Sequence, residues 1–280
     1  LNGIRRLEMN WLRKILDDLA PHFENGGRFE KLAPVFEATD TILFSTDERT
    51  DSGPHIRDSV DIKRVMILVV IALIPCYIFG AINIGYQKSL TFGYSSTWFE
   101  NLVTGLISIV PIIAVTFISG AFWELLFGIV RKHSISEGFL VTCALIPLTL
   151  PPSIPLWQVA VATSFGIVIG KEIFGGVGMN IFNPALMARA FLYFTYPVDI
   201  SGDKVWALAP DGYSGPTALS IPAGQTNANA VDLLNQASSD LVFDFSWMNM
   251  FQGWIPGSIG ETNKIIILFG AGFLILVGIT

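Results

Sequence analysis

This 280-residue sequence is poor in charge, because only 14% of its residues are Asp, Glu, Lys or Arg, whereas 51% are hydrophobic. A soluble domain carries about 25% charged residues, so the composition argues against an ordinary soluble protein. The formal net charge is −6, and no basic stripe of the kind that binds nucleic acid is present. We therefore expect a membrane protein without a nucleic-acid partner.

Motifs built on cysteine, histidine or glycine are also missing. Cys76 and Cys143 lie far apart in apolar segments and form no C-x-x-C motif. His22, His55 and His133 are scattered through polar segments without the spacing of metal ligands. No P-loop and no G-x-G-x-x-G after a strand occurs. These absences predict two buried thiols, no metal cluster and no dinucleotide site.

Long hydrophobic runs are what the sequence has instead. Residues 65–86 and 101–130 are each long enough to span a bilayer, which takes about 20 residues, and Pro75 is expected to kink the first. Residues 138–150 are short for a span, and a further run covers 155–170, so a broken or re-entrant helix is expected. A moderately apolar helix is predicted at about 183–196.

The ends of the chain have different characters. Apolar residues recur at helical spacing in residues 7–20, which predicts an amphipathic helix on a membrane surface or a partner, or else an ordinary core-facing helix. The chain starts with Leu and stops inside an apolar run, so we expect further spans beyond it. The apolar positions of the first helix are Leu7, Trp11, Leu12, Ile15, Leu16 and Leu19.

The distribution of Lys and Arg predicts the orientation. Basic residues flank the ends of the first, second and fourth runs, whereas residues 197–262 contain one Lys, Lys204, among many acids. The positive-inside rule then places the N-terminus in the cytoplasm. The predicted organisation is a cytoplasmic amphipathic segment at 1–64, transmembrane helices at 65–196, an external loop region at 197–262, and the start of a further transmembrane helix at 263–280.

Three short segments are candidates for chemistry. Residues 211–219 form a Gly/Pro-rich turn in which the Thr217 hydroxyl could be esterified to the phosphate of FMN, or could be an ordinary loop residue. Asn180 and Asn183 flank a glycine turn, where they could hold a flat polar ring or simply cap a helix. Residues 119–124 could form a slot for a flat ligand or a packing face, and Glu124 is either a functional acid or a group that reaches water.

The sequence resembles the family of B subunits of Na+-translocating NADH:quinone reductases, from about residue 12 onward. Residues 211–219 look like the flavin-attachment motif D-G-x-S-G-A-T-x-L of that family. Other matches are His55–Arg64, Glu137–Phe139, Pro151–Gln158, Lys171–Glu172 with Phe174–Gly176, Asn183–Leu186 and Ile255–Glu261.

The resemblance implies a urea-transporter-like helical fold and a function in electron relay. It implies that electrons pass from a covalent FMN through a non-covalent riboflavin to ubiquinone, coupled to Na+ export across a bacterial inner membrane. The implied partners are the other subunits of a six-subunit complex and a flavin transferase, with no NADH site on this chain. The implied sites are Thr217 for FMN; Thr142, Asn180, Asn183 and Trp206 for riboflavin; Gly120, Ala121 and Phe122 for quinone or inhibitor; and Glu124 for sodium.

The match departs from the family at three of these places. Pro216 stands where the family usually has Ala, Met179 replaces the usual Arg, and Ala121 replaces a second Gly. Three alternatives remain open: the paralogous D subunit of an Rnf-type complex, a flavin-free channel or transporter, and a purely structural subunit. The long N-terminal segment and Tyr213 with Ala218–Leu219 favour the quinone reductase over the Rnf protein.

Overall fold

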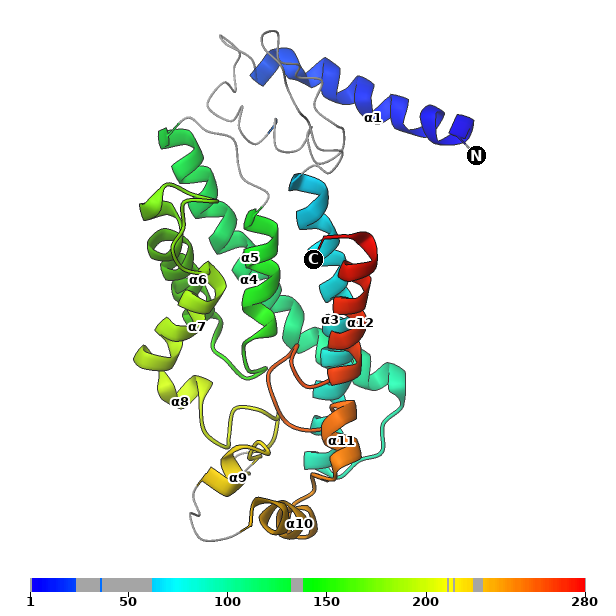
Figure 1. Ribbon diagram of the computed structural model, residues 1–280, viewed down its shortest axis with the longest axis vertical. Helices are drawn as coiled ribbons and strands as arrows, with labels where there is room; N and C mark the ends of the chain where they lie inside the picture. Colours follow the sequence, from blue (N-terminus) through cyan, green and yellow to red (C-terminus); the bar gives the residue numbers. More distant parts are fainter. Residues whose placement is uncertain are drawn as a thin grey trace.

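The computed structural model describes residues 2–23, 36, 62–131, 138–210, 212–213, 215–223 and 229–279. Within them the fold is all helical, with no strand, as predicted. Long apolar helices form a bundle, and short helices gather at one of its ends (Figure 1). The bundle helices are α3 (Ile62–Phe92), α4 (Trp98–Arg131), α5 (Gly138–Leu148), α6 (Leu156–Gly170), α7 (Pro184–Thr195) and α12 (Lys264–Val277). The other elements are α1 (Asn2–Phe23), η2 (Glu172–Phe174), α8 (Pro197–Ile200), α9 (Ser220–Ala223), α10 (Ala230–Asp240) and α11 (Trp247–Gln252).

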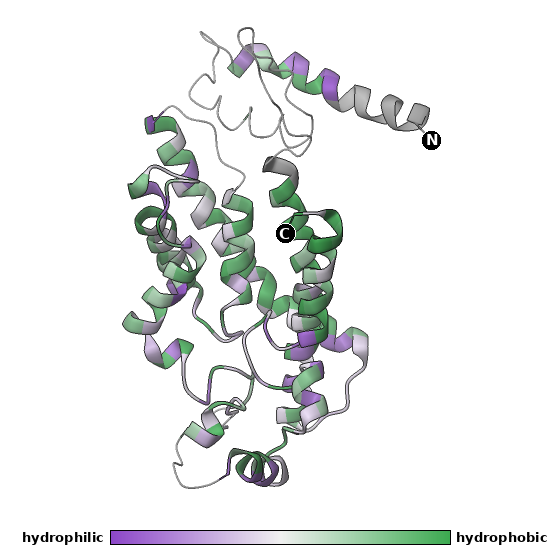
Figure 2. Ribbon diagram, viewed as in Figure 1, coloured by the Kyte–Doolittle hydropathy of each residue, from purple (hydrophilic) through white to green (hydrophobic). Residues whose placement is uncertain are grey.

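Three helical segments are long and apolar enough to cross a membrane: Val65–Phe92, Trp98–Arg131 and Leu156–Phe174. They correspond to the first, second and fourth predicted runs, although α3 and α4 extend beyond the apolar residues. Figure 2 shows hydrophobic residues along almost the full length of the bundle helices. Ile and Phe side chains on the outer faces of α3 and α4 are exposed rather than packed in a core, which is the expected arrangement for helices in lipid.

The chain between α5 and α6 forms the expected break. α5 has 11 residues, and at 1.5 Å per residue it is about 16 Å long, roughly half the thickness of a hydrocarbon core. The backbone that follows it is paired with the segment before α12. Ile259 N donates to Leu150 O at 3.2 Å, and Gly260 N donates to Leu148 O at 2.9 Å. The non-helical backbone between α5 and α6 therefore has hydrogen-bond partners inside the protein, as a membrane-embedded break requires.

Small residues let the bundle helices approach closely. Gly85 on α3 packs against the backbone of Asn101, and Gly105 on α4 packs against the backbone of Ala81. A Cβ atom at either glycine would collide with that backbone. Backbone contact through small residues is the usual basis of helix packing in membranes, and here it fixes α4, which carries Glu124, against α3.

The region predicted as a polar external loop contains a small apolar cluster of its own. Phe243 and Phe245 are buried there with Ala207 and Ile255, and Leu90 near the end of α3 packs against them. Composition alone did not indicate this cluster, because its aromatic residues are spread among many polar ones. The cluster gives the chain around Thr217 a folded support at the end of the bundle.

Helix α1 covers the predicted residues 7–20 and lies at the opposite end of the bundle from α9 and α10 (Figure 1). Leu16 is buried, whereas Ile15 and Leu19 are each 43% exposed. The side chains of residues 2–12 lie outside the described residues, as do His55 and His133. The exposed pair leaves part of the predicted apolar face open to a membrane surface or a partner.

Candidate functional site

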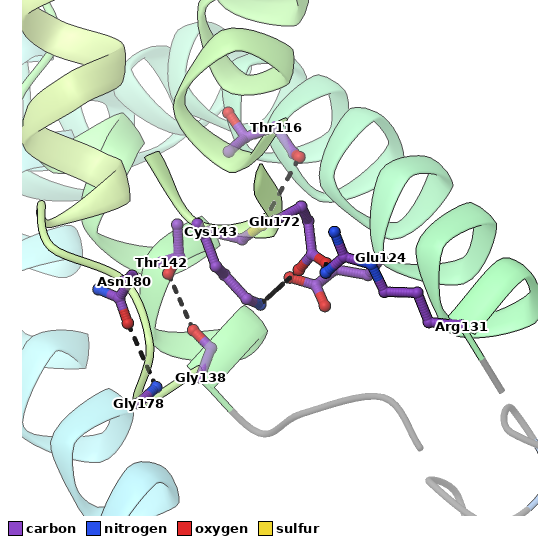
Figure 3. A network of polar contacts seen from close by, with 10 residues as sticks. Thr116, Glu124, Arg131, Gly138, Thr142, Cys143, Glu172, Gly178 and Asn180 are labelled. Atoms are coloured by element: carbon purple, nitrogen blue, oxygen red, sulfur yellow. Dashed lines mark hydrogen bonds and ion pairs between the residues drawn. The ribbon is translucent and has the colours of Figure 1, made fainter. Parts of the chain in front are cut away.

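A cluster of buried charges lies where α4 and α6 end. Glu124 on α4 is 2% exposed, and it forms an ion pair with Lys171, which directly follows α6. Lys171 Nζ is also 3.6 Å from Glu172 Oε1. The other oxygen of Glu172, Oε2, is 3.5 Å from Nη1 of Arg131, the last residue of α4 (Figure 3). Two carboxylates and two cations therefore alternate in one chain of contacts.

Burial makes this cluster costly to disturb. Lys171 and Glu172 are 2% and 1% exposed, so neither charge is solvated by bulk water. A buried charge is tolerated only when it is paired, and removing one partner of such a pair typically costs about 3–5 kcal/mol. The sequence pattern singles out Glu124 alone as a functional acid. In the sequence, Lys171 and Glu172 are two charged residues at the end of a predicted span, and the neighbouring residues do not predict that they are buried.

Gly120 lies one helical turn before Glu124 and faces the same interior. A Cβ at Gly120 would be 2.5 Å from Cys143 Sγ and 2.9 Å from Phe139 Cε2. Ala121 and Phe122, by contrast, are exposed on the outer face of α4. The three residues expected to contact quinone or inhibitor therefore do not share one face within this chain. Cys143 is a buried free thiol, as predicted, and so is Cys76.

The predicted riboflavin residues fall into two groups. Thr142, on the second turn of α5, is buried and donates to Gly138 O at 2.9 Å, close to the glycine turn that bears Asn180 (Figure 3). Trp206 instead follows Val205, whose carbonyl accepts a hydrogen bond at 2.9 Å from Ser153, beyond the other end of α5. The structure brings Thr142 and Asn180 to one end of α5 and Trp206 to the opposite end.

Both asparagines stabilise the local backbone. Asn180 accepts from Gly178 N at 3.3 Å and donates to Phe182 O at 2.9 Å, which closes the turn. Gly178 has φ of +85°, a conformation that favours glycine. Asn183 caps α7 by accepting from Ala185 N at 2.9 Å. Asn183 is thus a helix cap and Asn180 closes the glycine turn, while within the described residues the amide nitrogen of Asn183 makes no hydrogen bond.

Thr217 lies on the turn that leads into α9, at the end of the bundle opposite α1. Its hydroxyl oxygen accepts a hydrogen bond from Ser220 N at 3.3 Å, and its carbonyl accepts one from Ser220 Oγ at 2.9 Å. The residue is half-buried. Nearby, Gly215 N donates to Asp203 O at 2.6 Å, so the motif is tied to the loop that follows α8.

The aromatic residue of the same motif anchors it to the apolar cluster. The ring of Tyr213 meets that of Phe243 edge to face, with the centroids 5.9 Å apart. Burial raises the pKa of the Tyr213 phenol above its usual value, so the group stays neutral at physiological pH. The turn that bears Thr217 is therefore held by hydrogen bonds on one side and by an aromatic contact on the other.

A family model described as the NQR2, RnfD, RnfE family matches residues 49–280. This chain belongs to that family. Members similar to it include proteins named as the B subunit of Na(+)-translocating NADH-quinone reductase. The one from Chromohalobacter salexigens is 46% identical over 95% of this chain and 67% of its own length. Those from Azotobacter vinelandii and Yersinia pestis are 47% and 43% identical, over 95% and 94% of this chain and 69% of their own lengths.

Proposed function

We propose that this chain is a membrane subunit of a sodium-pumping NADH:quinone reductase, and that it carries a covalent FMN on Thr217. The position of Thr217 is the main support, because it combines the flavin-attachment motif with a hydroxyl on a supported turn outside the membrane helices. Relatives with the matching subunit name, at 43–47% identity, support the same assignment.

The surroundings of Thr217 fit a phosphoester. Within the described residues its hydroxyl oxygen accepts a long cap bond from Ser220 N and its proton is donated to no acceptor, which suits attack by a modifying enzyme. The neighbouring Gly215 and Pro216 add no long side chain to the turn. We propose that a flavin transferase forms the ester at this oxygen and that the apolar cluster under Tyr213 holds the product in a fixed place.

A second flavin, riboflavin, is proposed at the inner glycine turn. Thr142, Asn180 and Asn183 would contact it, and exposed apolar side chains beside the asparagines offer a surface for a flat ring. Those exposed side chains are Met179, Ile181 and Phe182. The resemblance also implies Trp206 as a riboflavin contact, and this residue lies toward the other end of α5. Bound flavins supply the electron transfer, and the protein positions them and tunes their surroundings.

Ubiquinone and Na+ are proposed to act near α4. Gly120 would shape the interior side of a quinone or inhibitor site, while Ala121 and Phe122 would meet it, or another subunit, from the outer face. Glu124 is the proposed Na+ residue, because it is a buried acid in a membrane span. The proposed partners are the other subunits of the complex, and the proposed location is a bacterial inner membrane with residues 197–262 outside.

The family also contains RnfD, so an Rnf-type protein is the main alternative. A complex assembled with the full-length chain should reduce ubiquinone with NADH, and Na+ should stimulate that reaction. Deleting the chain should abolish quinone reduction. Reduction of NAD+ by ferredoxin without quinone activity would support the Rnf assignment, and absence of both activities together with absence of protein-bound flavin would support a flavin-free transporter.

A further inference from the structure

Lys171 lies between two buried carboxylates but is hydrogen-bonded to only one of them. Its ammonium group pairs with Glu124, and its distance to Glu172 Oε1 is 3.6 Å. Glu172 Oε1 is buried and accepts no hydrogen bond from the part of the chain that the structure describes. A buried acceptor without a hydrogen bond is unfavourable, and Lys171 Nζ is already within ion-pair distance of this oxygen, so Glu172 Oε1 offers the lysine a second acceptor.

The side chain of Lys171 is suited to moving between these two positions. An ammonium group carries three donors on a flexible four-carbon stem, so it can exchange acceptors without the fixed geometry that a guanidinium requires. The two carboxylates come from different elements, Glu124 from α4 and Glu172 from η2. A small rotation of the stem would therefore transfer the positive charge from one element to the other.

We propose that Lys171 is a tethered cation that competes with Na+ for the carboxylate of Glu124. In this proposal Na+ occupies Glu124 only when Lys171 has moved onto Glu172, and the return of Lys171 expels the ion. The inference rests on the proposed function, because it explains how a Na+ site at Glu124 would be filled and emptied.

Charge balance supports this exchange. Among the described residues, the four groups Glu124, Lys171, Glu172 and Arg131 carry two negative and two positive formal charges, so Na+ would add one positive charge to them. Arg131 can accommodate the added charge because its side chain is 33% exposed, and its guanidinium lies 5.0 Å from the centre of the Phe127 ring. When Lys171 takes Glu172, Arg131 can turn its charge toward water.

The exchange predicts shifts of opposite sign in the half-saturating Na+ concentration. Lys171→Met removes the internal competitor, so half-saturation should fall. Arg131→Gln removes the cation that pairs with Glu172, so Glu172 accepts Lys171 more readily and the half-saturating Na+ concentration should also fall. Glu172→Gln weakens the second position and keeps Lys171 on Glu124, so half-saturation should rise. Couplings between sites are typically about 5- to 150-fold, and we expect shifts of roughly fivefold or more.

The test is a Na+ titration of NADH:quinone reductase activity in membranes that contain the complete complex. Half-saturation and maximal rate are measured separately for each variant. Arg189→Gln is the matched control, because its ion pair with Glu261, at 3.8 Å, is solvent-exposed and lies outside the cluster. It should leave half-saturation unchanged.

Opposite shifts for Lys171→Met and Glu172→Gln would support the proposal. Shifts in the same direction, or lower maximal rates with unchanged half-saturation, would overturn it, since a purely structural ion pair predicts that result. If Lys171→Met does not assemble, opposite shifts of Arg131→Gln and Glu172→Gln decide the matter. A wild-type complex without any Na+ response would contradict the proposed function itself, whereas Na+ stimulation with unshifted variants contradicts only the exchange.

Discussion

The ammonium group of Lys171 and the carboxylate of Glu124 form an ion pair between side chains that are each 2% exposed, across 47 residues of sequence. The pair joins the end of α6 to α4 inside the bundle. An acid that is buried and paired in the interior does not reach water at the membrane surface, and a functional role for Glu124 stays a prediction. Two helix ends are thereby linked through charge as well as through apolar packing.

Breaking this pair from one side should destabilise the protein more than removing it from both sides. Glu124→Gln leaves the buried Lys171 ammonium with the more distant carboxylate of Glu172, at 3.6 Å, and Lys171→Met removes the ammonium group from the buried carboxylate of Glu124. Each change should lower the stability by about 3–5 kcal/mol, and the double variant should lower it by less than the sum. Thermal unfolding of the full-length protein in detergent measures this. Strictly additive losses would mean that the two groups do not interact.

Gly120 should be intolerant of even one methyl group. The Cβ of Gly120→Ala would be 2.5 Å from Cys143 Sγ, so α4 and α5 must separate, at a cost of about 1–3 kcal/mol. Ala121→Ser adds one atom on the exposed face of the same helix and should change stability by about 0.5 kcal/mol or less. Cys143→Ala should restore the Gly120→Ala variant in part, because Phe139 Cε2 would still lie 2.9 Å from the new Cβ. Equal unfolding temperatures for Gly120→Ala and Ala121→Ser would refute the inward packing of Gly120.

The proposed orientation can be tested by labelling single cysteines in intact cells. Both native cysteines are buried, so their background should be low. Ser239→Cys on α10 is exposed and should react with a membrane-impermeant maleimide from outside. Asp18→Cys on α1 is equally exposed but should react only after the cells are opened. Labelling of Asp18→Cys in intact cells, with Ser239→Cys protected, would reverse the orientation.

The helices were predictable because hydrophobic runs of sufficient length dictate them in lipid. The break after α5 was also predictable from the short run and Pro151–Pro152. The charge cluster was not, because the contact between Glu124 and Lys171 depends on how α4 and α6 pack, and no local pattern encodes that. The family resemblance also implied that Trp206 and Thr142 contact the same riboflavin, whereas the two residues lie near opposite ends of α5.

The apolar cluster beneath Thr217 is a second feature that the sequence did not predict. Phe243 and Phe245 lie near the flavin motif only through tertiary folding, so no local pattern indicates that this turn has a firm support. The chemistry of the turn, in contrast, was visible directly, because a threonine in a recognisable motif requires no knowledge of distant contacts. Local motifs were predictable, and the packing that holds them was not.

Covalent attachment of FMN to Thr217 can be measured by in-gel flavin fluorescence of the denatured, full-length protein, coexpressed with its flavin transferase. The wild-type band should fluoresce, and Thr217→Ala should not. Thr97→Ala is the matched control, because Thr97 also caps a helix, accepting from Glu100 N at 3.4 Å, but lies outside the motif; it should keep its fluorescence. A dark wild-type band, or a Thr217→Ala band as bright as wild type, would contradict covalent FMN at Thr217.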